Sequence, residues 1–539
     1  MSGAVLEAET VAPTPPPPLP SSAEPGCSTG RIPLGLGLAA GAVAVLALVP
    51  VAYLLVRAGE GGWSTAADTL LSDRTAALLA RSLGLGVAVT AVSAVVGVVL
   101  AWLTVRCDLP GRRVWRVVAA LPLAVPSYVG GFAYVAAFPH LAGFWGAWLT
   151  LTLLSYPMVF LPVAAALDRL DPAYEEVSQS LGHGPLTTFL RATLPQLRPA
   201  AATGSLLVFL YVLSDFGAVS ILRFDSFTRV IYQSYQASFD RTPAVLLGCL
   251  LLVVTLGVVG AEMASRGRAR YWSSGPGLRR PPRTAVLGRA RVPALLVPLG
   301  VAVLALGVPA VTLGRWLVDS VQASPDLARL RGAMEGSLVA AGLGAALTVA
   351  AAVPVALLAA RHRGRLARAV EHSSYVAHAL PGIVIALSLV FFSARYLTAL
   401  YQRLPVLVFA YVVLFLPLAV SAVYASAVQA PPRLDEVARS LGRRPTAAFG
   451  SVTVPLLAPG LGAGAALVFL TSMKELPATL LLSPTGYDTL ATRVWTATSG
   501  GRFGDAALPA ALLILVAALP TFLLSRRLGE RQVTLEPAP

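Results

Sequence analysis

The most constraining feature of the sequence is a polar segment that occurs twice. The residues from Glu175 to Pro199 read EEVSQSLGHGPLTTFLRATLPQLRP, and those from Asp435 to Pro459 read DEVARSLGRRPTAAFGSVTVPLLAP, without a gap at a shift of 260 positions. Over the wider windows 171–200 and 431–460, twelve of thirty positions are identical. The chain is therefore predicted to consist of two copies of one structural unit.

The composition predicts that both copies lie in a membrane. Hydrophobic residues make up 56% of the chain and charged residues 12%, and the mean hydropathy of +0.73 is too high for soluble domains. A helix needs about 20 apolar residues to span a bilayer. We therefore predict an all-α polytopic membrane protein of two tandem six-helix units, with about 12 transmembrane helices. The expected spans are 34–56, 82–105, 117–138, 141–167, 200–222, 243–261, 292–314, 336–360, 373–394, 404–428, 461–482 and 506–525.

Each repeated segment lies between the predicted fourth and fifth spans of its unit and contains a Gly-x-x-Pro break. Gly182 precedes Pro185 in the first copy, and Gly442 precedes Pro445 in the second. Glycine commonly ends a helix and proline commonly starts one. Each segment is therefore predicted to form two short helices joined by a turn, outside the bilayer.

The two segments resemble the EAA loop of ABC importer permeases. An acid is followed by two small or apolar residues, three variable positions and glycine, and a Leu-Pro or Val-Pro comes further on. The strict Glu-Ala-Ala form is replaced by Glu-Val-Ser and Glu-Val-Ala. In that family the loop docks the cytoplasmic ATPase. The resemblance implies docking residues Glu176, Gly182, Pro185, Pro195, Glu436, Gly442, Pro445 and Pro455.

Together with the repeat and the spans, the resemblance implies a type I ABC importer permease arrangement in five parts. These are a disordered, Pro-rich cytoplasmic tail (1–31), a first six-span unit (32–265) with docking loop 171–199, a basic cytoplasmic linker (266–291), a second six-span unit (292–528) with docking loop 431–459, and a C-terminal tail (529–539).

Basic residues indicate the orientation, because they accumulate in cytoplasmic loops. With both termini and both repeats inside, 27 basic residues fall on the cytoplasmic side, 13 on the other side, and Lys474 within a span. The first span alone favours the opposite orientation, since Arg31 precedes it and Arg57, Arg74 and Arg81 follow it. We follow the total and predict a multi-pass protein of the bacterial plasma (inner) membrane with both termini cytoplasmic.

The sequence contains no motif for nucleotide binding or catalysis. Lys474 is the single lysine and no Gly-rich loop precedes it, so a Walker A phosphate loop is excluded. The five histidines and three cysteines show no ligand spacing, so no metal site is certain. We expect a permease subunit that is not an enzyme and binds no cofactor itself. ATP and Mg²⁺ would be used by a partner ATPase, and two docking loops imply two copies of it.

The net charge of +15 is interpreted as a consequence of topology. The arginines are scattered over short loops and do not gather on one folded face with aromatic platforms. We therefore expect contact with membrane lipid and no nucleic acid.

Two acids occupy equivalent positions in the repeat and lie within predicted spans. Asp215 falls opposite Glu475, roughly 16 Å along the fifth span from Gly204 and near the middle of a ~30 Å bilayer core. In one interpretation the acids pair with basic or hydroxyl groups on neighbouring helices and orient the bundle. In the other they flank the translocation path and favour a cation. Lys474 is adjacent to Glu475 but does not share its helix face.

Further segments resemble the fused ferric-iron permeases of the binding-protein-dependent transport system inner-membrane component superfamily. The segment Lys474-Glu-Leu-Pro resembles their KELP segment, and Ser214-Asp-Phe-Gly resembles its first-half counterpart. Each third span is also interrupted by proline, which either kinks a helix that lines a cavity or only adjusts packing. The candidate translocation path comprises Asp215, Glu475, Lys474, Pro126 and Pro381.

The resemblance implies the permease of an ABC importer for ferric iron, with substrate delivered by an extracytoplasmic solute-binding protein and ATP hydrolysed by a separate subunit. Thiamine, polyamine and phosphonate permeases share the fold, so these substrates stay open. An ion-driven secondary transporter of twelve spans would also show two halves and intramembrane acids, but would not need matched docking loops. A channel or scaffold gives no reason for the acid and glycine to recur.

Overall fold

The computed structural model describes residues 32–171, 173–237, 240–266, 284–322, 326–362, 364–378 and 381–530. Within these residues the chain is helical and forms no strand; one isolated β-bridge joins Cys107 to Ala285. The predicted all-α class is therefore confirmed. The predicted tail 1–31, residues 267–283 of the predicted linker and residues 531–539 of the C-terminal tail lie outside the described residues.

The first half of the chain runs from α1 to α13, with η denoting short 3-10 or π helices. Its elements are α1 (Leu34–Glu60), α2 (Trp63–Leu70), α3 (Asp73–Val105), α4 (Arg112–Ala120), η1 (Leu121–Ala124), α5 (Ser127–Ala137), η2 (Pro139–Leu141), α6 (Phe144–Ser155), α7 (Pro157–Arg169), α8 (Ala173–Ser180), α9 (Pro185–Thr188), η3 (Phe189–Thr193), α10 (Leu194–Ser214), α11 (Gly217–Ile221), α12 (Phe227–Ala237) and α13 (Thr242–Arg266).

The second half repeats this order. Its elements are η4 (Gly288–Ala290), α14 (Arg291–Ala302), η5 (Val303–Gly307), α15 (Val308–Gln322), α16 (Leu327–Arg361), α17 (Arg365–His378), α18 (Gly382–Tyr396), α19 (Leu404–Gln429), α20 (Pro432–Ser440), α21 (Pro445–Ala448), η6 (Phe449–Thr453), α22 (Val454–Lys474), α23 (Pro477–Leu482), α24 (Leu490–Ser499) and α25 (Phe503–Glu530).

Every predicted span overlaps an apolar helix, although not all of these helices are long. In the described residues, nine helices or helical runs are long and apolar enough to cross a membrane. A tenth is counted if α4–η1 and α5, which are bent by 94°, form one broken span. The predicted ninth and twelfth spans correspond to shorter apolar helices, Gly382–Tyr396 and Phe503–Ala518.

Each half has a core of three equivalent helices. In the first half α3, α7 and α10 pack against one another, and in the second half α16, α19 and α22 do the same. The crossings of the first half are close because glycines face backbone there. A Cβ on Gly204 of α10 would lie 2.7 Å from the Cα of Val159, and one on Gly97 of α3 would lie 2.9 Å from the nitrogen of Phe160. Small residues at membrane helix crossings allow such approach.

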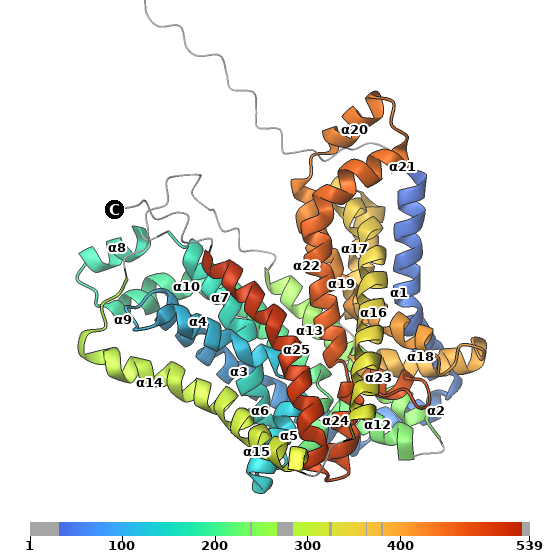
Figure 1. Ribbon diagram of the computed structural model, residues 1–539, viewed down its shortest axis with the longest axis horizontal. Coiled ribbons are helices and arrows are strands. Elements are labelled where there is room, and N and C mark those ends of the chain that lie inside the picture. Colours follow the sequence, from blue (N-terminus) through green and yellow to red (C-terminus); the bar gives the residue numbers. More distant parts are fainter. Residues whose placement is uncertain are drawn as a thin grey trace, which may run out of the picture.

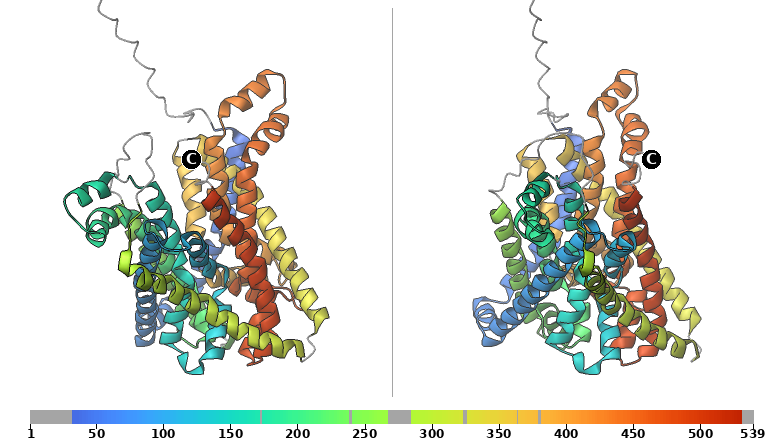
Figure 2. Two further views of the ribbon diagram at one scale, coloured as in Figure 1. Left: turned by 60° about the vertical axis from the view of Figure 1, so that its left-hand side comes forward. Right: turned by 90° about the vertical axis from the view of Figure 1, so that its left-hand side faces the viewer.

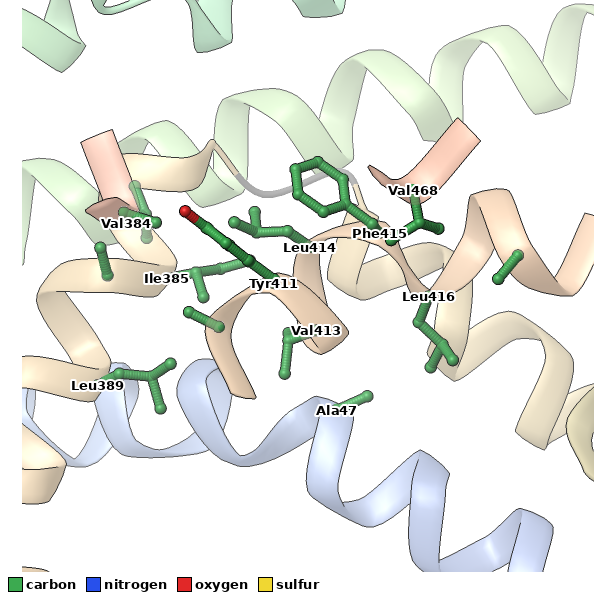
Figure 3. Close-up of a cluster of buried hydrophobic side chains, with 14 of the residues drawn as sticks. Ala47, Val384, Ile385, Leu389, Tyr411, Val413, Leu414, Phe415, Leu416 and Val468 are labelled. Carbon is green, nitrogen blue, oxygen red and sulfur yellow. The ribbon is translucent and has the colours of Figure 1, made fainter. Parts of the chain in front are cut away.

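The first helix of each half packs on the other half. Helix α1 contacts α16, α17 and α18, while α14 and α15 contact α3, α4 and α5 (Figure 1). Figure 3 shows Ala47 of α1 in the same buried cluster as Leu389 of α18 and Val413 of α19. This exchange of first helices joins the two halves.

A hydrogen bond joins the first helix of each half to a helix of the other half. The hydroxyl of Ser388 on α18 donates to the carbonyl oxygen of Pro50 on α1 at 2.6 Å. Reciprocally, the hydroxyl of Tyr134 on α5 donates to the carbonyl oxygen of Leu304 in the π turn η5 at 2.5 Å. Leu304 lies in the π turn η5, which departs from α geometry, whereas Pro50 lies within α1.

Both repeated segments project from the same end of the molecule. Helices α8 and α20 lie toward the upper end in Figure 1, and the further views agree (Figure 2). Elements α2, α12 and α24 lie at the opposite end (Figure 1). The two segments can therefore face one partner layer, as the predicted topology requires.

The close crossing at Gly204 predicts a difference between two equivalent glycines. Gly204→Ala should destabilise the fold by about 1–3 kcal/mol, because the new methyl group meets the Val159 backbone. Gly464→Ala is the matched control, because the nearest atom to a Cβ there is 3.5 Å away. We expect a lower thermal unfolding midpoint for the first variant and an unchanged or slightly higher midpoint for the second. Equal midpoints would contradict the crossing described here.

Candidate docking hairpins and intramembrane acids

The two repeated segments form matching helical hairpins. Gly182 and Gly442 end α8 and α20 with left-handed backbone, at φ values of +83° and +84°. In the first hairpin the N–H of His183 donates to the carbonyl oxygen of Ser178 at 3.3 Å, and the N–H of Gly182 to that of Gln179 at 2.9 Å. The turn satisfies the last carbonyls of α8 in the way that a left-handed glycine permits. The predicted role of both glycines as helix ends is confirmed.

The second helix of each hairpin is longer than predicted. Pro185 and Pro445 start α9 and α21 as expected, but the helices continue as runs of 30 residues, Pro185–Ser214 and Pro445–Lys474. The predicted short second helix of each hairpin is therefore wrong. The second hairpin helix and the span are one element.

A π turn lies where each hairpin helix enters its span. In η3 the N–H of Leu194 donates to the carbonyl oxygen of Phe189, five residues back, and in η6 Val454 does the same with Phe449. Pro195 and Pro455 follow directly, in the first turns of α10 and α22. Proline cannot donate to the carbonyl four residues back, so a wider turn accommodates it without ending the helix.

An exposed apolar stripe runs along the first helix of each hairpin. In α8 the side chains of Val177 and Leu181 are 61% and 72% exposed, and in α20 those of Val437 and Leu441 are 53% and 79% exposed. Tyr174 and Leu434 extend the stripes. A helix that leaves such a stripe uncovered is suited to insertion into an apolar groove of a partner. We call these residues the docking stripes: Tyr174, Val177 and Leu181, and Leu434, Val437 and Leu441.

Sequence reasoning missed the docking stripes, although the sequence carries a signal for them. Positions three and four residues apart on α8 and α20 carry apolar residues in both copies, and this spacing is a helical signal. Of the predicted acids, Glu176 is half-buried and Glu436 is exposed.

The preceding acid of each hairpin ties it to a transmembrane helix. In the first half Glu175 lies 3.7 Å from the guanidinium of Arg106, which follows α3, and accepts a hydrogen bond of 2.9 Å from the hydroxyl of Thr193. The side chain of Arg106 is only 2% exposed. At 3.7 Å the arginine and the acid form an ion pair without a hydrogen bond, and burial strengthens their Coulomb attraction. We call this trio the first brace.

The second half contains the same contacts at equivalent positions. Asp435 lies 3.1 Å from the guanidinium of Arg361, which ends α16, and accepts hydrogen bonds of 2.9 Å from the hydroxyl of Thr453. This trio is the second brace. Each brace joins α8 or α20 to the π turn and to the end of α3 or α16. Sequence reasoning missed both arginines because they lie far from the acids along the chain.

The two intramembrane acids were predicted to lie within helices. In the structure each one directly follows the end of a helix. Helix α10 ends at Ser214 and α22 at Lys474, so Asp215 and Glu475 each take an extended conformation, with ψ of 128° and 119°. The placement of Asp215 in the middle of a continuous fifth span is therefore wrong. Each acid begins a reversal into a short helix, α11 or α23.

Each carboxylate caps the short helix that follows it. Asp215 Oδ1 accepts from the N–H groups of Ala218 and Val219 at 3.0 and 3.2 Å. Glu475 Oε1 accepts from the N–H of Ala478 at 3.1 Å. These bonds satisfy donors that a helix start leaves free. The interpretation of the acids as orienting groups thus gains a specific geometry, which is capping.

The predicted prolines precede helices that pack on the short helices following the acids. Pro126 and Pro381 immediately precede α5 and α18 in extended conformations. Helix α5 packs on α11, and α18 packs on α23, so each interrupted third span meets the break after its half's fifth or eleventh span. The first-half interruption bends the chain by 94°, which is a break and not the modest kink expected from proline alone.

Lys474 connects the two halves. Its ammonium group donates to the carbonyl oxygen of Leu123, in the broken third span of the first half, at 3.1 Å. As expected from helix geometry, the described residues show no ion pair between Lys474 and Glu475. The described part of the chain also holds no group of three or more His, Cys, Asp or Glu side chains placed for a metal.

The first brace predicts that one hydroxyl steadies the hairpin. Thr193→Val keeps the shape of the side chain but removes its hydrogen bond to Glu175, at a cost of about 1 kcal/mol. We expect the amides of α8 to exchange with solvent roughly fivefold faster, measured by hydrogen exchange and mass spectrometry. Thr187→Val, on the same run but outside the brace, is the control. Unchanged exchange in α8 would show that the brace contributes nothing.

Comparison with known proteins agrees with this geometry. Residues 93–262 and 352–532 match the family described as binding-protein-dependent transport system inner membrane component. The chain is 38% identical over 484 residues to the Fe(3+)-transport system permease protein FbpB 2 of Haemophilus influenzae, covering 89% of this chain and 95% of the relative.

Relatives of half the length match as well. The sulfate transport system permease proteins CysT of Salmonella typhimurium and Escherichia coli are 26% and 25% identical over 260 residues, which cover 43% of this chain and 94% of each relative. The family match extends over more than half of the sequence and occurs once in each half. The chain therefore belongs to the family of binding-protein-dependent transport system inner membrane components.

Proposed function

We propose that this chain is the permease subunit of an ABC importer that carries ferric iron across the bacterial inner membrane. The pair of braced hairpins, each with a docking stripe at the same three positions, carries the assignment to an ATP-driven importer. The substrate assignment is supported by the relative from H. influenzae, whose name specifies Fe(3+) transport.

The proposed complex contains two copies of a cytoplasmic ATPase, one on each hairpin. Both hairpins and both termini would then be cytoplasmic, and the opposite end of the molecule would face the solute-binding protein. This chain would bind no cofactor, and ATP and Mg²⁺ would be used in the ATPase. Two hairpins that project from the same end support one ATPase pair beneath both halves (Figure 1).

Each hairpin would transmit motion of the ATPase to the point where its transmembrane helix ends. The run Pro185–Ser214 begins in the hairpin and ends next to Asp215, a length of about 45 Å at 1.5 Å per residue. The second run, Pro445–Lys474, connects its hairpin to Glu475 in the same way. Closure of the ATPase pair would therefore move the helix ends that carry both acids. The braces would transmit the same motion to α3 and α16.

A cavity at the opposite end offers a contact for the binding protein. It has a volume of about 590 Å³ and is lined by Arg81, Arg223, Asp225 and neighbouring apolar residues. Arg81 lies near the start of α3, and the hairpin contact Arg106 follows the end of this helix. Exposed charges of this kind favour encounter with a complementary surface.

The tests below also distinguish two alternatives, namely transport of an oxyanion such as sulfate and ion-driven secondary transport. The CysT relatives are named for sulfate, but carboxylates at both breaks disfavour an oxyanion in the path. An ion-driven secondary transporter would have no use for two braced hairpins with exposed apolar stripes.

Disruption of the docking stripes should detach the ATPase. We expect Leu181→Asp and Leu441→Asp each to weaken ATPase binding about tenfold or more, since a buried leucine contributes roughly 1.5–3 kcal/mol. The measurement is the amount of ATPase that co-purifies with the permease from membranes. Leu71→Asp is the matched control, because Leu71 is 84% exposed but follows α2 at the opposite end. Full retention of ATPase by the double variant would refute the docking assignment.

Transport of iron is tested in vesicles that hold this chain, its ATPase and its binding protein. We expect uptake of labelled ferric iron that requires ATP and is unaffected by excess thiamine or sulfate. ATP-dependent entry of thiamine or sulfate without iron would support the ABC importer assignment but replace ferric iron as the substrate. Iron uptake driven by an ion gradient without ATP would instead assign the chain to the secondary transporters.

A further inference from the structure

A cavity of about 560 Å³ lies at the end of the molecule that carries the docking hairpins. It is lined by Asp108, Leu109, Gly111, Arg112, Arg113 and Thr284. All but Thr284 belong to the segment that leads from the end of α3 into the first turn of α4. Arg106 begins this segment and contacts Glu175 of the first hairpin, so the cavity adjoins the first brace. The volume lies within the range of about 300–1,000 Å³ that is usual for ligand sites.

The start of the second half supplies one wall of this cavity. The N–H of Ala285 donates to the carbonyl oxygen of Arg106 at 2.7 Å, and the N–H of Asp108 donates to that of Ala285 at 3.2 Å. Asp108 Oδ1 also accepts from the N–H of Leu287 at 2.9 Å. These bonds hold the segment around Thr284 against the first half. The cavity is therefore a fixed feature of the junction between the halves.

Two arginines of the lining have no counter-charge. Arg112 is half-buried and Arg113 is exposed, and within the described residues neither guanidinium group forms an ion pair. Asp108 is the one carboxylate of the lining, and it is engaged by the backbone of Leu287. The segment 267–283, which precedes Thr284 in the sequence, contains no Asp or Glu. The lining thus carries a net positive charge that attracts an anion.

Apolar residues follow the two arginines in α4. The side chain of Val114 is 63% exposed. Trp115 comes next, and its indole N–H donates to the carbonyl oxygen of Pro110 at 3.1 Å. Helix α4 then continues through η1 to the broken third span. Arginine and tryptophan at the start of a membrane span are typical of the level at which lipid headgroups meet hydrocarbon.

We propose that this cavity binds the phosphate group of an anionic phospholipid, from the leaflet at the hairpin end of the molecule. Arginine suits this ligand, because its planar set of N–H groups can donate two parallel hydrogen bonds to phosphate oxygens. Basic pockets at the ends of membrane helices bind such headgroups. The exposed Val114 favours a lipid over a soluble phosphate, since acyl chains would cover its side chain. The proposal does not depend on which substrate is transported.

The bound lipid would stabilise the junction between the halves. Its phosphate would neutralise Arg112 and Arg113 beside the backbone hydrogen bonds that join Arg106 and Asp108 to the start of the second half. Because Arg106 also belongs to the first brace, the lipid would steady the first hairpin more than the second.

The test uses the permease with its ATPase in nanodiscs of phosphatidylcholine that contain increasing fractions of phosphatidylglycerol. Native mass spectrometry counts the phosphatidylglycerol molecules that stay bound after release from the nanodisc. We expect wild type to retain one molecule, and the double variant Arg112→Gln/Arg113→Gln to bind it about 10- to 30-fold more weakly, at about fivefold for each arginine. The matched control is Arg365→Gln/Arg368→Gln. These arginines are exposed on α17, which precedes the interruption of the second half, and they do not line the cavity, so the control should retain the lipid.

Soluble phosphate distinguishes the two sources of the ligand. Excess glycerol 1-phosphate should leave phosphatidylglycerol bound, and its displacement of the lipid at equal concentration would overturn the lipid assignment. Equal retention of phosphatidylcholine by wild type, full retention of phosphatidylglycerol by the double variant, or the same loss in the control variant would overturn the site. Co-purified ATPase and the thermal midpoint verify that each variant is folded, and the wild-type comparison of the two lipids requires no variant. Iron uptake is not measured, so failure of the lipid site leaves the importer assignment intact.

Discussion

Backbone polar groups that are freed inside the membrane need a partner from the protein, because hydrocarbon offers none. This requirement explains most of the specific contacts of the structure. The carboxylates of Asp215 and Glu475 take up N–H groups where two helices end and reverse. Side chains also donate to carbonyl oxygens at other irregular points: Lys474 to Leu123, Tyr134 to Leu304, and Thr228 and Thr479 to the two acids themselves. At these breaks of the described chain, donors and acceptors of the protein thus replace the missing helical partners.

The backbone of the two halves is closely similar, whereas the polar groups at the breaks have diverged. The hairpins, glycines, π turns and braces match position by position. At the breaks, Ser127 has Gly382 as its equivalent, and Lys474 stands where the first half has Ser214. Fusion of the halves in one chain permits this divergence, because each position is encoded separately. The proposed docking hairpins have stayed alike, and the polar groups at the breaks have diverged.

The sequence predicted what depends on local pattern. Hydrophobic runs predicted the helices, and the repeat with its Gly182 and Pro185 predicted the hairpins, because glycine and proline restrict the backbone at their own positions. It did not predict that Asp215 ends a helix, since an apolar run continues on both sides of the break and conceals it. The braces were also beyond reach, because Arg106 and Glu175 come together only through the packing of α3 against the bundle. The sequence also did not predict that the two carboxylates accept different numbers of hydrogen bonds, because this depends on which groups lie next to each acid in the fold.

The exchange of first helices sets an order of events during synthesis. Helix α1 ends at residue 60, but α16, the first of its second-half partners, begins at residue 327. At a translation rate of about 5–20 residues per second, α1 waits in the bilayer roughly 15 to 50 seconds before that partner is made. During this interval the surface that will bury Ala47 is covered by lipid or by a membrane insertion factor. Completion of the first half therefore does not complete its fold, and the whole permease closes only when the second half arrives.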